Sequence, residues 1–124
     1  PPQPSIDSRA DRAAGQWWNW SPELVEQAQA QGRTVLVDFT AAWCITCQVN
    51  KRTTLEQPDF LAALREGNVL ALRADWTRHD PVITQALADL DRTSIPVYAI
   101  YKPGAAPRVL SELITIQDVL SALR

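Results

Sequence analysis

Residues 37–48 read Val-Asp-Phe-Thr-Ala-Ala-Trp-Cys-Ile-Thr-Cys-Gln, and the rest of the chain is best interpreted from this stretch. It holds both cysteines of the protein, Cys44 and Cys47, spaced C-x-x-C after an apolar run typical of a buried strand. A helix that begins at such a motif has unpaired N–H groups and a partial positive charge at its N-terminus, and both stabilise a thiolate. A second cysteine one turn later can attack a mixed disulfide formed by the first. The stretch therefore predicts a dithiol/disulfide exchanger.

The composition is that of a single globular domain without a strong charge. The chain has 124 residues, of which 46% are hydrophobic and 21% charged, with a formal net charge of -2. That length suits one core, and the lack of a basic excess argues against nucleic acid as a partner. We expect a monomeric domain. Apolar runs stay well short of the ~18 residues that a membrane-spanning helix needs. Because the chain starts at Pro1 and shows no signal peptide, we expect a fragment or a processed product.

The cysteine count argues against a metal centre. Zinc needs four ligands, and besides carboxylates the chain offers only Cys44, Cys47 and His79. We therefore expect no metal site and no cofactor other than a redox-active Cys44–Cys47 disulfide. A copper(I) carrier is an alternative, since soft thiolates suit that ion, but the chain has no methionine and His79 is distant in sequence. His79 itself is interpreted as a loop histidine without function, because the sequence shows no partner for it.

The chain divides into a lead-in and a folded domain. Residues 1–16 are rich in Pro, Ser, Arg and Ala and predict a flexible linker or tether, whereas residues 17–124 predict the domain. Trp17, Trp18 and Trp20 open the domain. They could anchor the chain at a membrane interface or pack as a hydrophobic lid on the core, and we favour the packing interpretation.

Periodicity and caps predict an alternation of helices and strands. The predicted strands are 34–40, 68–75, 97–101 and 108–113, and the predicted helices are 22–31, 44–54, 58–66, 81–91 and 116–124. One parallel crossover followed by a hairpin indicates a mixed sheet covered by helices on both faces. The expected fold class is α/β, with a central sheet of about four strands.

Asp38 and Pro96 are the unusual residues of this pattern. Asp38 is a carboxylate inside an apolar strand, so burial should raise its pKa and let it exchange protons with the cysteines. The alternative is a strand-edge aspartate bonded to a backbone N–H. Pro96 opens the strand 97–101 and is a candidate for a cis peptide bond. Lys51 lies two helical turns after Cys44, where its charge could favour the thiolate, but we favour a solvated surface lysine.

These features resemble the thioredoxin fold over roughly residues 21–124. Asp38 falls on the position of that fold's buried aspartate, Cys44 and Cys47 on its active-site motif, and Pro96 on its cis-proline. Within the fold, residues 40–51 (TAAWCITCQVNK) are most similar to the C-terminal thioredoxin-like domain of the DsbD family, including the related ScsB-type proteins of copper tolerance. The sequence departs from that family at Lys51, where relatives often carry a glutamate. Any tuning of the nucleophile by that acid is therefore not carried over.

The resemblance implies a place and a direction for the chemistry. DsbD-type proteins are membrane proteins that move electrons from cytoplasmic thioredoxin, through a transmembrane domain, to periplasmic partners. A protein-disulfide reductase domain is thus expected, tethered to the inner membrane in the periplasm. Its electron donor would be the transmembrane domain of the same parent protein, and its acceptors would be periplasmic thioredoxin-like proteins.

Each residue of the motif then has an expected role. Cys44 is the expected nucleophile and Cys47, more buried, the resolving cysteine. Because Ile45 and Thr46 carry no charge, thiolate stabilisation should be modest, which favours a reductant. The partner-binding residues are expected to be Trp43, Ile45, Thr46, Ile95 and Pro96, with the backbone of Ile95 pairing with an extended partner segment. A thiol oxidase or isomerase of the same fold is the main alternative, and a redox-inactive interaction domain is another.

Overall fold

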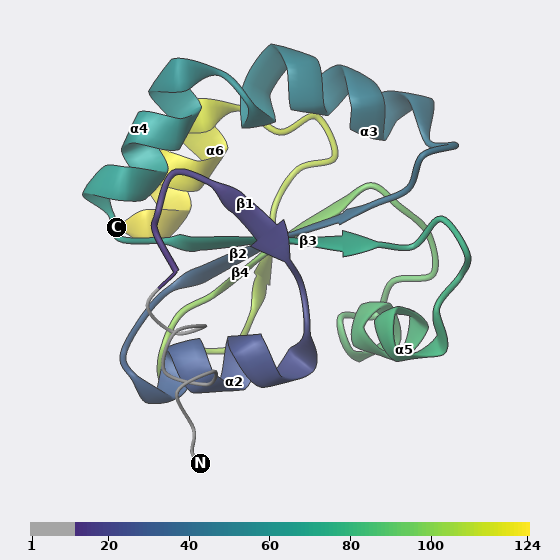
Figure 1. Ribbon diagram of the computed structural model, residues 1–124, viewed down its shortest axis with the longest axis horizontal. Helices are drawn as coiled ribbons and strands as arrows, with labels where there is room; N and C mark the ends of the chain where they lie inside the picture. Colours follow the sequence, from purple (N-terminus) through teal and green to yellow (C-terminus); the bar gives the residue numbers. More distant parts are fainter. Residues whose placement is uncertain (1–11) are drawn as a thin grey trace.

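The computed structural model describes residues 12–124 and has a five-stranded sheet between two layers of helix (Figure 1). The strands are β1 (Trp17–Asn19), β2 (Val35–Thr40), β3 (Leu70–Asp75), β4 (Val97–Tyr101) and β5 (Arg108–Val109). The helices are α2 (Pro22–Ala30), α3 (Ile45–Asn50), the π-helical segment η1 (Lys51–Leu55), α4 (Pro58–Glu66), α5 (Pro81–Asp89) and α6 (Ile116–Leu123). The α/β class and the thioredoxin-like architecture are confirmed, with one strand more than the expected four.

The sheet is mixed, and β2 lies at its centre. Its strand order is β1-β3-β2-β4-β5. The strands β1 and β2 pair parallel with β3, whereas β4 pairs antiparallel with both β2 and β5. Parallel neighbours need a crossover, which α3, η1 and α4 provide between β2 and β3. Because β2 is paired on both edges, the chain leaves the centre of the sheet directly into the cysteine motif.

Each face of the sheet packs on its own apolar cluster. Helices α2 and α5 cover one face, and α3, α4 and α6 cover the other (Figure 1). Alternate residues of β2 therefore point in opposite directions. Val37 and Phe39 belong to the cluster under α2 and α5, whereas Leu36 packs in the cluster that includes Leu55 and Phe60. Asp38, next on the Leu36 side, thus faces the layer that contains the cysteine helix.

Short polar signals define the ends of the helices. Ser21 caps α2 by accepting the N–H of Leu24, with proline at the first helical position. Thr115 and Asp118 form a reciprocal capping box at the start of α6. Both helices begin at the residue that the sequence predicts, Pro22 for α2 and Ile116 for α6. Caps of this kind are local sequence patterns, so they indicate where a helix begins.

Three elements differ from the sequence prediction. Strand β1 was not predicted, because its three residues are too few to show an alternating pattern. The predicted strand 108–113 shrinks to Arg108–Val109, since only these residues pair with β4. The single helix predicted over 44–54 is instead α-helical to Asn50 and π-helical over Lys51–Leu55.

The tryptophans at the start of the domain pack on it. Trp17 and Trp18 lie in β1, and the indole N–H of Trp17 donates to the carbonyl of Leu55 at 3.0 Å. Trp20 contacts the ring of Phe39 at a centroid distance of 6.4 Å. The interpretation that these tryptophans pack on the core is confirmed, because all three contact its apolar clusters.

The predicted linker over residues 1–16 lies mostly outside the described residues. Within the described part, the carbonyl of Ala13 accepts the indole N–H of Trp18 at 3.0 Å, and Gly15 is buried against Arg65. Gly15 has φ +83, a conformation that favours glycine. Over residues 12–124, none of the helices is both long and apolar enough to cross a membrane.

Candidate redox site

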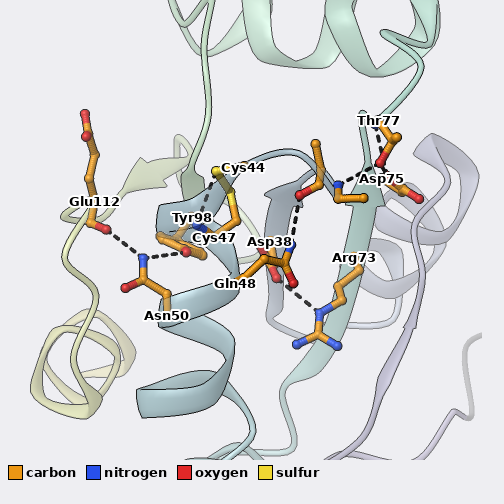
Figure 2. Close-up of a disulfide and its surroundings, with 12 residues drawn as sticks. Asp38, Cys44, Cys47, Gln48, Asn50, Arg73, Asp75, Thr77, Tyr98 and Glu112 are labelled. Carbon is orange, nitrogen blue, oxygen red and sulfur yellow. Dashed lines mark hydrogen bonds and ion pairs between the residues drawn. A yellow bond between two sulfur atoms is a disulfide. The ribbon is translucent and has the colours of Figure 1, made fainter.

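The two cysteines form a disulfide at the start of α3 (Figure 2). Cys44 is the N-cap residue of this helix, and its sulfur accepts the backbone N–H of Cys47 at 3.2 Å. This hydrogen bond would stabilise negative charge on the Cys44 sulfur after reduction. Cys44 is 8% exposed and Cys47 is 1% exposed. The order of exposure is the one expected for an attacking Cys44 and a resolving Cys47.

Trp43 is held beside the disulfide by the loop after β3. Its indole N–H donates to the carbonyl of Thr77 at 3.0 Å, and its ring stacks on His79 at a centroid distance of 5.5 Å. His79 also meets the ring of Trp76 edge-on at 4.5 Å. The expectation that His79 has no partner is therefore wrong, because the loop brings it between two tryptophans. Trp43 remains 51% exposed, so its ring offers an apolar surface beside Cys44.

The other predicted partner-binding residues surround the disulfide. Ile45 is 80% exposed and Thr46 is exposed, so both face solvent directly after Cys44. Ile95 packs against the small cluster of Ala41 and the two cysteines. The peptide bond between Ile95 and Pro96 is cis, which confirms that part of the sequence prediction.

Asp38 is a buried acid with a cationic partner on the neighbouring strand. It is 1% exposed, and its Oδ2 lies 3.2 Å from Nε of Arg73 on β3, opposite it in register (Figure 2). Burial raises the pKa of Asp38 to about 6, although the charge of Arg73 acts in the lowering direction. The pKa prediction is confirmed. The alternative of a strand-edge aspartate is wrong, since β2 is paired on both sides.

A pocket of about 270 Å³ is lined by Arg73, the ion-pair partner of Asp38. Thr40 and Arg73 line it together with Gln48 and Lys51. Oγ1 of Thr40, Nη2 of Arg73 and Oδ1 of Asp38 are buried and have no hydrogen-bond partner within the described chain. The pocket has room for several water molecules, and water is the usual partner of such buried polar atoms. Lys51 lies at this pocket, and its charge acts to lower the pKa of Asp38.

A second polar network, which sequence analysis missed, ties α3 to β4. The side-chain amide of Asn50 donates to the hydroxyl of Tyr98 at 2.8 Å and to the carbonyl of Glu112 at 2.9 Å (Figure 2). Tyr98 lies opposite Asp38 in the β2–β4 register, and burial raises its pKa to about 12. Asn50 and Tyr98 are 48 residues apart in sequence, so only the packing of α3 on β4 brings them together. The network fixes the cysteine helix over the strand that follows Pro96.

The described residues offer no obvious metal centre. Within residues 12–124, no group of three or more His, Cys, Asp or Glu side chains is placed to hold a metal ion.

A comparison with protein families agrees with this geometry. A family model described as thioredoxin-like matches residues 16–103. The chain belongs to the thioredoxin-like family. The match includes both cysteines, Asp38 and the cis Pro96, so the site lies inside the region that defines the family.

Individual relatives narrow the resemblance further. The chain is 31% identical to the thiol:disulfide interchange protein DsbD 1 of Pseudomonas aeruginosa over 106 residues, which is 82% of this chain and 18% of that protein. It is 40% identical to DsbD of Pseudomonas fluorescens over 48 residues, which is 39% of this chain and 8% of that protein. The chain thus spans less than a fifth of the length of either relative.

A solved structure shows the same fold. The C-terminal domain of Neisseria meningitidis DsbD in its oxidised form superposes with a TM-score of 0.68, at 19% identity, covering 86% of this chain and 99% of that one. The fold, the Cys44–Cys47 disulfide and the DsbD-named relatives together support thiol:disulfide exchange as the chemistry of this site.

Proposed function

We propose that this domain is a dithiol/disulfide reductase that receives electrons from a membrane-embedded part of its parent protein. It would pass them to periplasmic thioredoxin-like proteins, and it would act in the periplasm, tethered to the inner membrane. The observation that carries the proposal is the pair of cysteines at the start of α3, with Cys44 the more exposed. The similarity to DsbD proteins supports the direction and the place. The reduced Cys44/Cys47 dithiol would carry the two electrons and become the disulfide when it gives them up, so the proposed chemistry uses no further cofactor.

The reaction would run in two displacements. The thiolate of Cys44 attacks a sulfur of the acceptor's disulfide, and the acceptor's other sulfur leaves as a thiolate that takes up a proton. The thiolate of Cys47 then attacks the Cys44 sulfur of this mixed disulfide. The Cys44–acceptor bond breaks, the acceptor leaves as a dithiol, and the Cys44–Cys47 disulfide forms. Two electrons and two protons move to the acceptor in total.

Asp38 would take the proton that Cys47 must lose. Cys47 is buried, and a buried thiol ionises poorly without a nearby base. With a pKa of about 6, Asp38 is mostly ionised at neutral pH yet can still accept a proton. The pocket lined by Thr40 and by Arg73, the partner of Asp38, would hold water that could carry that proton to solvent.

The acceptor would dock on the exposed surface around Cys44. Trp43 and Ile45 offer apolar surface, and the backbone of Ile95 ahead of Pro96 would pair with an extended segment of the acceptor. A small contact of this kind dissociates quickly, as electron transfer between proteins requires.

The proposal is tested by mixing the reduced domain with an oxidised periplasmic thioredoxin-like acceptor. Alkylation followed by mass analysis then measures the loss of the acceptor's disulfide. We expect Cys47→Ser to accumulate a mixed disulfide with the acceptor, because the resolving thiol is missing, and the matched Cys44→Ser variant to form none. The proposal fails if the reduced wild-type domain leaves the acceptor oxidised while the oxidised domain makes disulfides in reduced peptides.

A further inference from the structure

The guanidinium of Arg73 is shared by two acids that differ in burial. Its Nε lies 3.2 Å from Oδ2 of Asp38, and its Nη1 lies 3.0 Å from Oε2 of Glu56. The side chain of Asp38 is 1% exposed and that of Glu56 is 51% exposed. One cation therefore links the buried acid of the redox site to an acid at the surface.

Trp17 holds the guanidinium in place from a third direction. Its ring lies under Arg73, with 4.7 Å from Cζ to the ring centroid, which is within the range of a cation–π contact. Trp17 is itself fixed, because it lies in β1 and its indole N–H donates to the carbonyl of Leu55. Arg73 is thus anchored by Trp17 and Asp38 even without the charge of Glu56.

We propose that Glu56 is a positioning residue of the redox reaction, which acts through Arg73 to weaken the hold of that cation on the Asp38 carboxylate. This inference rests on the proposed function, in which Asp38 accepts the proton of Cys47. If Arg73 formed an ion pair with Asp38 alone, it would keep that acid ionised and make it a poor proton acceptor. Sharing the cation with Glu56 keeps Asp38 able to hold a proton close to neutral pH.

The other charged groups around Asp38 do not replace Glu56 in this role. Arg73 and Lys51 both favour the ionised carboxylate, whereas Glu56 disfavours it. Tyr98, on the β4 side, stays neutral at physiological pH because its pKa is raised to about 12. On the side of α3, the sulfur of Cys47 is part of the disulfide in the oxidised protein. Among these neighbours, Glu56 is the acid whose charge opposes the two cations.

A purely structural role of Glu56 makes the opposite prediction. If Glu56 only anchored Arg73, its loss would let the guanidinium move toward solvent, and Asp38 would lose its cation and bind protons more tightly. If Glu56 instead competes for the charge, its loss strengthens the Asp38–Arg73 pair, and Asp38 binds protons less tightly. The sign of the change therefore separates the two roles.

The test is a carbon-13 NMR titration of the Asp38 carboxyl group in the oxidised protein, for the wild type, Glu56→Gln and Arg73→Gln. The glutamine side chain can still accept a hydrogen bond from Arg73, so Glu56→Gln removes mainly the charge. We expect its Asp38 midpoint to fall by about half a pH unit or more, a roughly threefold loss of proton affinity. Arg73→Gln should move the midpoint in the opposite direction.

Glu66→Gln is the matched control, because it removes an exposed acid near the end of α4 that is not among the partners of Arg73. The Asp38 midpoint of this variant should stay within about 0.1 pH unit of the wild-type value, a much smaller change than the one expected for Glu56→Gln. An unchanged or higher midpoint in Glu56→Gln overturns the proposal, whether or not Arg73→Gln folds.

A second readout connects the titration to the reaction. The pH dependence of mixed-disulfide resolution by Cys47 should move to lower pH in Glu56→Gln, in step with the Asp38 midpoint. If the Asp38 midpoint falls but the resolution profile does not move, Glu56 is not a positioning residue of the reaction. If the domain proves to oxidise rather than reduce its acceptors, the proposed function fails, while the NMR result still decides whether Glu56 acts on Asp38.

Discussion

The two faces of β2 differ sharply in chemistry, although their residues alternate along one strand. The face under α2 and α5 is wholly apolar, with Val35, Val37 and Phe39 fully buried. The opposite face changes from Leu36 to Asp38 and Thr40 as the strand approaches the cysteines. The apolar face contributes to stability through burial, and the polar face holds groups that burial destabilises. We infer that burial on the apolar face compensates for the free-energy cost of burying polar groups on the other face.

The largest expected effect comes from weakening the apolar face. Phe39→Ala removes a fully buried ring that contacts Trp20, and it should lower the free energy of unfolding by about 3–5 kcal/mol. Because Phe39 points away from the layer that holds α3, the reduction potential of Cys44/Cys47 should stay the same. Urea unfolding and redox equilibration measure the two quantities. A stability loss below about 1 kcal/mol, or a clear change in potential, would contradict the division between the faces.

On the polar face, removing the buried charge of Asp38 should raise stability instead of lowering it. The pKa of Asp38 is raised from 3.8 to about 6, so between these values the folded state binds more protons than the unfolded state. The contribution of Asp38 to stability should therefore be greatest below about pH 4 and fall as the pH rises through about 6.

Asp38→Asn should remove this loss and stabilise the oxidised protein at pH 8 by on the order of 1–3 kcal/mol. Arg73 would still have Glu56 as a partner in this variant. Urea unfolding at pH 4 and pH 8 gives the comparison, and mixed-disulfide resolution should slow at neutral pH. If the stability difference between variant and wild type is the same at both pH values, the ionised carboxylate of Asp38 does not destabilise the folded protein, and this prediction is wrong.

Sequence alone predicted the parts of the site that short local sequence patterns mark. The C-x-x-C motif, the buried Asp38 and the proline before β4 each have a local signature, and the structure contains all three. Strand β1 left no such signature, because it forms only when three residues pair with β3. The short β5 is likewise limited by the extent of its pairing with β4.

The partners of these residues were not predictable from local patterns. Arg73 meets Asp38 across 35 positions of sequence because β2 and β3 pair in parallel with these two residues opposite each other. Asn50 reaches Tyr98 because helix α3 packs over β4, which no local pattern predicts. An arginine inside a strand pattern is a weak signal for a buried acid nearby. Arg73 was the sequence signal of this kind for a partner of Asp38.

The reduction potential of the Cys44/Cys47 pair tests the central claim most directly. Equilibration of the domain against a dithiothreitol or glutathione series measures it. Because neither Ile45 nor Thr46 adds a charge beside the thiolate, we expect a value between about -270 mV, as for thioredoxin, and about -200 mV, as for glutaredoxins. A value near about -120 mV would mark a disulfide-forming oxidant and contradict the assignment as a reductase.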